Sequence, residues 1–422
     1  MFFDYLVEHN RYLNLVGIAV ILGLAALCSK KRTAIDIKLI GKALLLQFFI
    51  ALIVLKTAFG KACIATVAHL VAALYSCADT GISFMFGSLT DPSMPWGFVF
   101  AIKVLPIIIF FGALTAVLFH LGIIQLVVHG IQRLIHPVLG TSGAETLCAV
   151  ANSFLGQTEA PLLVRNYLAR MTKSEIMVVM VSGMATISGA IVAVFAAMGV
   201  PVEHILSASV MAIPGSLMIA KILYPETETQ ETEGGASVTF ENPSSTIFDA
   251  MATGTLDGLR LALNVGAMLI AFLAFLALIN GGCAWVCEQI NHMLAHLNVA
   301  VQIPIFNLDT FFSYLMYPFA YLLGFTGNDA LVAGKLLGTK VAINEVIAYG
   351  QLVKSGFSER MVAIMTYALC GFSNFSCIGI QVGGIGALVP EKRAWITELG
   401  LYAVLGGALS NLLSAMVASL LL

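Results

Sequence analysis

The chain has 422 residues, of which 59% are hydrophobic and only 10% are charged, with a formal net charge of −2. Ordinary soluble domains carry roughly 25% charged residues, so this composition indicates a protein that crosses a membrane several times. The charge balance also argues against a nucleic-acid partner, because binding phosphates requires a basic surface.

The amino-terminal segment predicts a span followed by a cytoplasmic turn. Its hydrophobic run, Tyr12 to Cys28, lacks the basic start and the small-residue cleavage site of a signal peptide, so we expect a retained helix. The run ends at Lys30-Lys31-Arg32, which the positive-inside rule places in the cytoplasm. The amino terminus is therefore expected outside.

Two further spans are predicted before the first unusual segment. Apolar runs from Leu39 to Ala58 and from Trp96 to Val128 each reach the length of about twenty residues that a bilayer requires. The stretch between them contains Lys61, His69 and Asp79 and is amphipathic. We therefore expect it to lie in the membrane interface.

The region Thr141 to Met171 predicts a re-entrant hairpin. Its two apolar arms, each about a dozen residues long, meet at Gly156-Gln157-Thr158-Glu159, and neither arm is long enough to cross a bilayer. Basic residues flank the region, with Arg133 before it and Arg170 and Lys173 near its end. We therefore expect the hairpin to enter and leave on the cytoplasmic side.

Two spans, Ile176 to Val200 and Ile205 to Leu223, are predicted after the hairpin. The polar segment Tyr224 to Glu241 contains several glutamates and no basic residue, so we expect a flexible solvated loop. A long span, Leu259 to Ile290, then returns the chain to the outer side.

The carboxyl-terminal third predicts a second hairpin and two last spans. Pro318 and several polar residues interrupt Ile305 to Lys354 too often for a lipid-facing helix, so we expect a hairpin that enters from outside. Spans follow at Met361 to Val389 and Trp395 to Leu422. The predicted fold is an all-α polytopic membrane protein, with about eight transmembrane helices, two opposed re-entrant hairpins and interfacial helices.

Three polar packets mark the candidate site. They lie at Gly156–Pro161 in the first hairpin, at Asn344-Glu345 in the second, and at Asn374 within Gly371–Cys377. Lipid tolerates an ionisable side chain beside a helix break only where both are buried in protein or line a wet cavity. Opposed hairpins also indicate an inverted repeat, in which broken helices of secondary transporters surround substrate and coupling ion.

These packets resemble the motifs of the concentrative nucleoside transporter family, in the same order. The matching stretches are Gly156–Pro161, Gly338-Thr339-Lys340 with Asn344-Glu345-Val346, Gly371–Ser376, and Lys103–Pro106. The resemblance implies a sodium-driven symporter that imports nucleosides such as uridine or adenosine across a bacterial cytoplasmic membrane. It also implies a homotrimer, and a protein that is not an enzyme and uses sodium as its coupling ion without a further cofactor.

The family's architecture, a scaffold that holds a mobile transport domain, implies a division of the chain. Residues 1–128 are expected to be mainly scaffold helices with an interfacial helix, and residues 129–223 the first hairpin and following helices of the transport domain. Residues 224–258 are expected to form a polar cytoplasmic loop and a short interfacial segment. Residues 259–290 would be a long scaffold helix, and residues 291–422 the second hairpin and last helices of the transport domain.

The resemblance also assigns roles to single residues. Those expected to contact the nucleobase are Gln157, Thr158, Glu159 and Phe372. Those expected to contact the ribose are Glu345, Asn374 and Cys377, and Ile191 is expected to add an apolar wall. Sodium is expected to be held by the side chains of Asn152 and Thr186 and by the backbone carbonyls of Leu155 and Ile187. These groups suit a nucleobase edge, a ribose diol and a hard cation that prefers oxygen ligands.

Two features vary within the family. Cys377 stands where many members have Ser, and a thiol is the weaker hydrogen-bond partner. Among the eight cysteines, we expect Cys377 to meet water and substrate and the others to be buried or at interfaces. Proton-coupled relatives depart from Gln-Thr-Glu at the first hairpin, so its presence at 157–159 favours sodium, with proton coupling as the alternative.

Other classes of protein remain to be weighed. A membrane-embedded enzyme would need an acidic metal-binding cluster or a nucleophile paired with a base, and the sequence shows neither pattern. A channel would have a continuous polar pore, whereas polarity here is concentrated at the hairpin tips. A carrier for another small polar solute stays open, because only the resemblance favours nucleosides.

Overall fold

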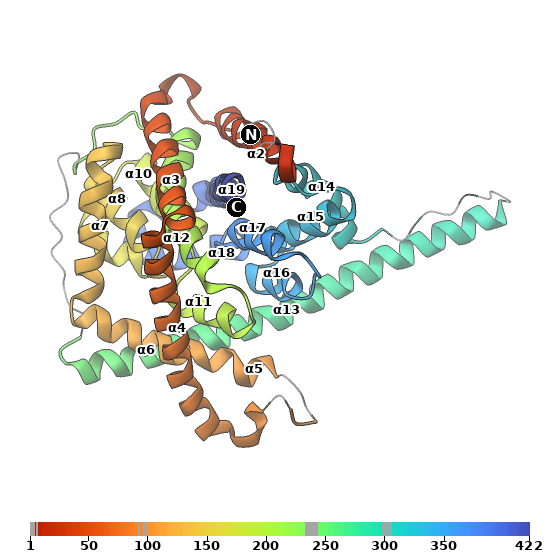
Figure 1. Ribbon diagram of the computed structural model, residues 1–422, viewed down its shortest axis with the longest axis horizontal. Helices are drawn as coiled ribbons and strands as arrows, with labels where there is room; N and C mark the ends of the chain where they lie inside the picture. Colours follow the sequence, from red (N-terminus) through yellow and green to blue (C-terminus); the bar gives the residue numbers. More distant parts are fainter. Residues whose placement is uncertain are drawn as a thin grey trace.

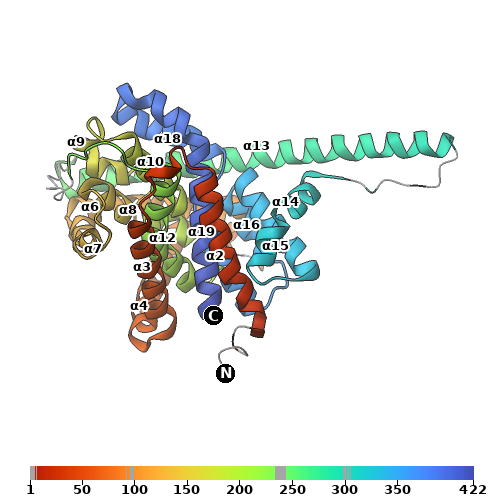
Figure 2. The same cartoon turned by 90° about the horizontal axis from the view of Figure 1, so that it is seen from above.

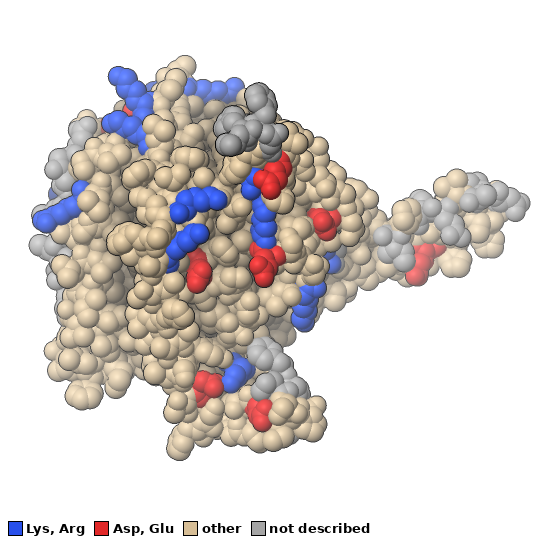
Figure 3. Space-filling model, in the orientation of Figure 1, with Lys and Arg blue, Asp and Glu red and all other residues tan. Residues whose placement is uncertain are grey.

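The computed structural model describes residues 5, 7–91, 93–95, 99–232, 244–297, 301, 304 and 306–422. The protein is all-helical, and eight helical segments in the described residues are long and apolar enough to cross a membrane. Charged side chains are sparse on the face shown in Figure 3, in keeping with a chain of which only 10% of the residues are charged. The predicted fold class is confirmed.

The centre of the bundle contains α12 (Val202–Leu223) and α19 (Arg393–Leu421), and α2 (Arg11–Leu27) and α3 (Ile37–Lys56) lie outside them. α12 and α19 pack against each other and are buried over most of their length. α2 packs along α19, and α3 packs along α12 (Figure 2). All four helices lie where spans were predicted.

The segment predicted to be interfacial forms α4 (Ala58–Phe86), a 29-residue helix followed by η3 (Gly87–Thr90). Together they are long and apolar enough to span a membrane by length and composition, and the interfacial placement stays a prediction. Part of the polarity behind that prediction is compensated, because Lys103 Nζ donates to Asp79 Oδ1 at 2.6 Å.

The predicted third span ends earlier than expected. α5 (Phe100–Lys103) and α6 (Leu105–His120) lead to Gly122, whose φ of 77° is a left-handed conformation that ends the helix. The following α7 (Ile123–Leu139) is a separate amphipathic helix that packs against α3 and against the first hairpin.

The long helix α13 (Ile247–His296) has 50 residues and exceeds the predicted span at both ends. It packs across α6, and one end projects beyond the rest of the molecule (Figure 1). A Cβ added to Gly112 of α6 would lie 2.7 Å from the Gly254 carbonyl oxygen and 2.9 Å from Gly258 Cα. Small residues therefore let the two helices approach closely, as is usual for helices packed in membranes.

Both predicted hairpins are present. The first contains α8 (Gly143–Ala151), a tip at 152–159, η4 (Ala160–Val164) and α9 (Arg165–Leu168). The second contains α15 (Gly327–Ala342) and α16 (Glu345–Leu352). It begins later than predicted because α14 (Leu308–Leu322) is a separate helix that packs against α15.

The span after each hairpin is broken, although the sequence analysis predicted continuous helices. The first broken helix is α10 (Lys173–Ala185) and α11 (Gly189–Ala197), and the second is α17 (Glu359–Leu369) and α18 (Ser376–Leu388). The molecule thus repeats one order of elements, namely hairpin, broken helix and long helix. The remaining described elements are η1 (Glu8–Asn10), η2 (Arg32–Ala34) and η5 (Pro390–Lys392).

Residues 224–232, which we call the strap, fold back against the first hairpin, whereas residues 227–229 and 231 within it are exposed. Thr172 Oγ1 donates to Glu226 Oε2 at 2.8 Å, and the Gly143 N–H donates to the Thr232 carbonyl at 2.9 Å. Composition indicated the polarity of this segment but not these partners. The rest of the predicted loop, 233–241, lies outside the described residues.

Candidate functional site

The tip of the first hairpin lies against both broken helices. A Cβ on Gly183 of α10 would lie 2.8 Å from Gln157 Cβ, and one on Gly384 of α18 would lie 2.6 Å from Thr158 Cγ2. Glycine at these two positions leaves the room that the tip occupies. Residues from both halves of the chain therefore meet at this point.

Four of the predicted substrate residues are joined by hydrogen bonds that link the two hairpins, and we call this series the polar network. Gln157 Nε2 donates to Cys377 Sγ at 3.3 Å. The Cys377 N–H donates to Asn374 Oδ1, and Asn374 Nδ2 donates to Glu345 Oε2, both at 3.0 Å. All four residues are buried.

The polar network lies at the amino-terminal ends of two short helices. Glu345 is the first residue of α16, and Asn344 caps that helix by accepting the Ile347 N–H at 3.0 Å. Asn374 accepts the N–H of Cys377 in the first turn of α18. Helix amino termini carry unpaired N–H groups and partial positive charge, which favour a carboxylate and other oxygen acceptors.

The other predicted substrate residues do not join the polar network. Thr158 is half-buried against Gly384, and Phe372 is half-buried at the break between α17 and α18. Ile191 is buried in α11. Glu159 is exposed, and its carboxylate folds back over Gly156, where its Oε2 occupies the position that a Cβ would take.

Two of the predicted ion ligands, Asn152 and Thr186, lie on either side of Ser182, near the end of α10. Asn152 Nδ2 donates to Ser182 Oγ at 2.9 Å, whereas its buried Oδ1 has no hydrogen-bond partner within the described part of the chain. The Thr186 hydroxyl donates to the Ser182 carbonyl at 2.8 Å, which leaves its oxygen lone pairs able to accept a cation. Leu155 lies in the tip of the first hairpin, and Ile187 lies in the break between α10 and α11. The carbonyls of both residues are therefore outside helices.

This set of ligands fits sodium. It offers amide, hydroxyl and carbonyl oxygens, the donors that a hard cation prefers. An unpartnered buried amide oxygen is costly to desolvate, and a bound cation would satisfy it. No group of three or more His, Cys, Asp and Glu side chains suited to a metal ion occurs among the described residues.

The prediction that Cys377 meets water is wrong. This thiol is only 3% exposed, because the Gln157 side chain covers it. The cysteines with exposed side chains are Cys28, Cys63 and Cys77. All eight cysteines are free.

Two side chains that support the site were missed by the sequence analysis. Gln381 is fully buried, and its Nε2 donates to Gln157 Oε1 at 3.1 Å and to the Met180 carbonyl at 2.9 Å. Ser182 accepts from Asn152 and is also fully buried. In the sequence, each of these two residues is a polar residue inside an apolar helix. This pattern predicts that the side chain has a buried hydrogen-bond partner, but it does not identify the partner.

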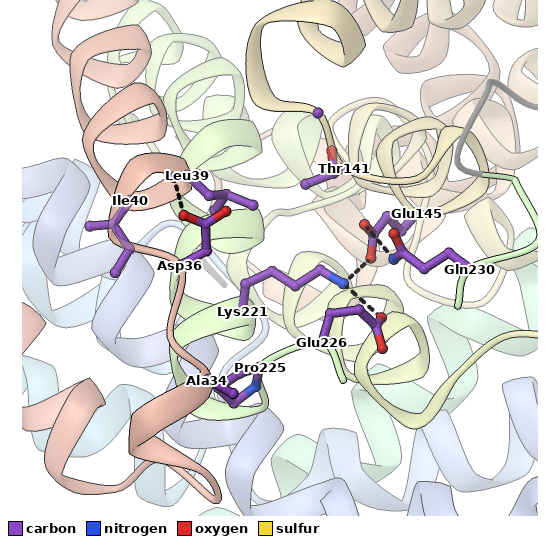
Figure 4. A pocket seen from close by; sticks show the side chains of 11 residues that line it. Ala34, Asp36, Leu39, Ile40, Thr141, Glu145, Lys221, Pro225, Glu226 and Gln230 are labelled. Atoms are coloured by element: carbon purple, nitrogen blue, oxygen red, sulfur yellow. Dashed lines mark hydrogen bonds and ion pairs between the residues drawn. The ribbon is translucent and has the colours of Figure 1, made fainter. Parts of the chain in front are cut away.

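A second group of charged residues lies away from the tip, at the base of the first hairpin. Lys221 Nζ lies 2.8 Å from Glu145 Oε2 and 3.3 Å from Glu226 Oε2. These residues border a cavity of about 180 Å³, where Gln230 of the strap also donates to Glu145 (Figure 4). Burial alone would raise the pKa of Glu226, but Lys221 and hydrogen bonds hold it below its ordinary value.

Family models of nucleoside transporters match most of the chain. The model described as "Na+ dependent nucleoside transporter N-terminus" matches residues 16–89, and the one described as "Nucleoside recognition" matches residues 101–201. The model described as "Na+ dependent nucleoside transporter C-terminus" matches residues 204–419.

Several curated proteins are similar over nearly the whole chain. The chain is 41% identical to an uncharacterized transporter of Haemophilus influenzae, over 96% of this chain and 97% of that protein. It is 38% identical to the nucleoside permease NupC of Helicobacter pylori, with the same two coverages. It is 36% identical to sodium/nucleoside cotransporter 1 of Rattus norvegicus, over 98% of this chain and 64% of the rat protein.

Solved structures of one transporter share the fold. The chain matches CNTnw in an inward-facing, substrate-bound state with a TM-score of 0.87 and 37% identity, over 97% of both chains. It matches a variant of CNTnw in an outward-facing state with a TM-score of 0.90, at the same identity and coverage.

Proposed function

Because the chain belongs to the family of sodium-dependent, concentrative nucleoside transporters, we propose that it is a symporter that imports nucleosides together with sodium ions by alternating access. The family consists of transporters and not of enzymes. The observation that carries the proposal is the polar network, which brings Gln157, Cys377, Asn374 and Glu345 together from both halves of the chain.

We propose that a nucleoside enters the polar network at its weakest link. The bond from Gln157 to Cys377 has a sulfur acceptor, which is weak, so it is the contact that a ligand replaces at least cost. Gln157 would then turn to the nucleobase, with Thr158 and Glu159 of the same tip beside it. Phe372 would lie against the base.

The ribose would meet the opposite end of the polar network. A carboxylate accepts hydrogen bonds only, so Glu345 suits a pair of ribose hydroxyl donors. Asn374 already donates to Glu345 and would hold its carboxylate in position for the sugar. Cys377 would add a weaker contact, and Ile191 would supply an apolar wall.

We propose that the coupling ion is sodium, held by Asn152, Thr186 and the carbonyls of Leu155 and Ile187. The unpartnered Asn152 Oδ1 supports this site. One cation that crosses about 100 mV contributes about 2.3 kcal/mol. A tenfold sodium gradient adds about 1.4 kcal/mol. Proton coupling is the second candidate.

For alternating access, we propose that α6 and α13 form the core of a scaffold, and that the two hairpins and broken helices move with the substrate. The close packing of α6 against α13 supports a rigid pair. α2 and α3, which the sequence analysis assigned to the scaffold, pack along α19 and α12 and so border the moving part.

We also propose a homotrimer in the bacterial cytoplasmic membrane, with the amino terminus outside. One end of α13 projects (Figure 1), and this helix exposes large apolar side chains such as Ile270, Phe275 and Trp285. In a membrane, such a surface contacts lipid or neighbouring subunits. The mass of the purified complex by light scattering with detergent correction tests the trimer.

Uptake into proteoliposomes tests the function. Labelled uridine or adenosine should accumulate when sodium is high outside and the interior is negative. Replacing sodium with choline at fixed pH and voltage should reduce the initial rate to the level of empty vesicles. Uptake that follows a proton gradient without sodium would establish the second candidate, and absence of nucleoside uptake under any gradient would contradict the proposal.

A further inference from the structure

A buried ammonium group lies in the second hairpin. Lys340 of α15 is 2% exposed. Its Nζ donates to the Ala368 carbonyl at 2.9 Å and to Asn411 Oδ1 at 2.6 Å. Burying an ammonium group is costly unless acceptors and negative charge surround it, so its place in the fold calls for a role.

The acceptors identify the environment as the carboxyl-terminal end of a broken helix. Ala368 lies in the last turn of α17, where carbonyls have no intrahelical partner and carry partial negative charge. Glu345, at the start of the other arm of the same hairpin, is also buried. The hairpin therefore buries one positive and one negative side chain on the two sides of its tip.

The first half of the molecule has the corresponding helix end without an ammonium group. There the end of α10, at Thr186 and Ile187, faces Asn152, whose Oδ1 has no partner in the described residues. Asn152 follows α8, the first arm of its hairpin, and Lys340 lies in the last turn of α15, the first arm of its own. Both therefore lie near the end of a first hairpin arm, beside the end of a broken helix.

One side chain connects these two places. Asn411 Nδ2 donates to the Ala185 carbonyl at the end of α10 at 2.7 Å, while its Oδ1 accepts from Lys340. Gly371 makes this possible, because a Cβ there would lie 2.5 Å from Asn411 Oδ1 and 2.7 Å from the Met184 carbonyl oxygen. The end of α10 and the break after α17 thus share Asn411.

We propose that the ammonium group of Lys340 is a built-in cation of the second half, which does at the end of α17 what the coupling ion does at the end of α10. It balances the charge of Glu345 and the end of α17, so that nucleoside binding needs a bound cation in the first half only. This inference rests on the proposed sodium-coupled function and specifies which half of the molecule takes the ion.

The test replaces Lys340 with the residue type found in the first half. Lys340→Asn removes the cation and leaves a shorter, neutral amide, with room for a bound cation near the Ala368 carbonyl and Asn411 Oδ1. We expect uridine affinity at low sodium to fall by about tenfold or more, and the number of sodium ions linked to uridine binding to rise from about one to about two. Lys340→Arg should keep the dependence on one ion. Lys354→Asn removes an exposed lysine near the same hairpin and should change neither quantity.

Uridine calorimetry over a series of sodium concentrations, on protein shown to be folded by gel filtration and thermal unfolding, separates the outcomes. An unchanged sodium dependence in folded Lys340→Asn would overturn the inference. If that variant does not fold, the wild type decides, because linkage to two sodium ions with Lys340 in place contradicts a built-in cation and linkage to one supports it. Wild-type uridine binding that ignores sodium would instead reject the proposed sodium coupling.

Discussion

The two hairpins place their buried charges at opposite ends. The first hairpin has its buried carboxylate, Glu145, at its base, where Lys221 of α12 joins it to Glu226 of the strap, whereas Glu159 at its tip is exposed. The second keeps Lys340 and Glu345 near its tip. Charges at a base can stabilise the fold, whereas charges at a tip are within reach of a ligand. We infer that the buried charges at the tip of the second hairpin serve binding, and that those at the base of the first hairpin serve stability.

The uncharged groups of the two hairpins also differ in position. The tip of the first hairpin offers amide and hydroxyl groups, which suit a mobile sodium ion and a nucleobase. The second hairpin is held elsewhere by apolar contacts, with the ring of Tyr349 4.3 Å from that of Phe195 and its hydroxyl donating to the Thr366 carbonyl at 2.8 Å. The buried charges of the two hairpins thus lie at opposite ends.

The largest expected effect concerns the base of the first hairpin. Lys221→Met should lower stability by about 3–5 kcal/mol, because it leaves the fully buried Glu145 without its cation. Thermal and denaturant unfolding in detergent would measure the loss. The folded fraction should bind uridine with unchanged affinity.

Two further variants make this test specific. Adding Glu145→Gln to Lys221→Met should restore part of the stability, because it removes the uncompensated charge. Lys42→Met removes an exposed lysine of α3 and should be neutral. If Lys221→Met weakened uridine binding but left stability intact, the assignment of charge at the base to stability would be wrong.

Next in size is the charged tip of the second hairpin. Glu345→Ala should weaken uridine binding by about 2–5 kcal/mol, because ribose hydroxyls and Asn374 would lose a buried charged acceptor. Its thermal stability should change less than that of Lys221→Met. Calorimetry with the exposed Glu288→Ala as a control would decide this, and wild-type affinity in Glu345→Ala would remove the residue from the site.

A smaller effect is expected at the tip of the first hairpin. Asn152→Ala should remove most of the sodium dependence of uridine binding, a coupling of about 1–3 kcal/mol, because it deletes the unpartnered amide oxygen. Uridine titrations at high and low sodium measure the coupling. Asn264→Ala on the exposed side of α13 should leave it intact. A full sodium response in Asn152→Ala would place the ion elsewhere.

The contrast between the hairpins could be predicted only in part from the sequence. The first hairpin was predicted because a polar packet separates two arms too short to cross, which is a local pattern. The resemblance to the family's motifs predicted that Gln157, Glu345 and Asn374 share one site. In the structure, hydrogen bonds that pass through Cys377 connect these three residues.

The remaining features depend on partners far apart in the chain. Thr186 and Ser188 are a weak signal for the break after α10, so a continuous span was predicted. The strap has a loop's composition, yet Gln230 and Thr232 find partners on α8. Likewise, Lys340 belongs to one of the motifs that resemble the family. Its hydrogen-bond acceptor Asn411 could not be predicted, because it lies 71 residues away in the chain.

The smallest expected effect tests the link between the two hairpins. Within the polar network, the bond from Gln157 to the Cys377 sulfur at 3.3 Å joins the tip of the first hairpin to the residues of the second half. In Cys377→Ser, the hydroxyl is a stronger hydrogen-bond partner than the thiol, both for a bound ribose and for Gln157 in the protein without nucleoside. The gain in binding free energy from the ribose contact is therefore partly offset by the stronger bond to Gln157 that the nucleoside must replace. We expect uridine affinity to change by about 0.5–1.5 kcal/mol at most, in the direction of tighter binding. Calorimetry should compare this variant with Cys287→Ser, which changes another buried cysteine on α13 outside the site. Equal and unchanged affinities in both variants would show that Cys377 contacts neither the ribose nor a bond that the nucleoside must break, and the contact between the hairpins would then be structural.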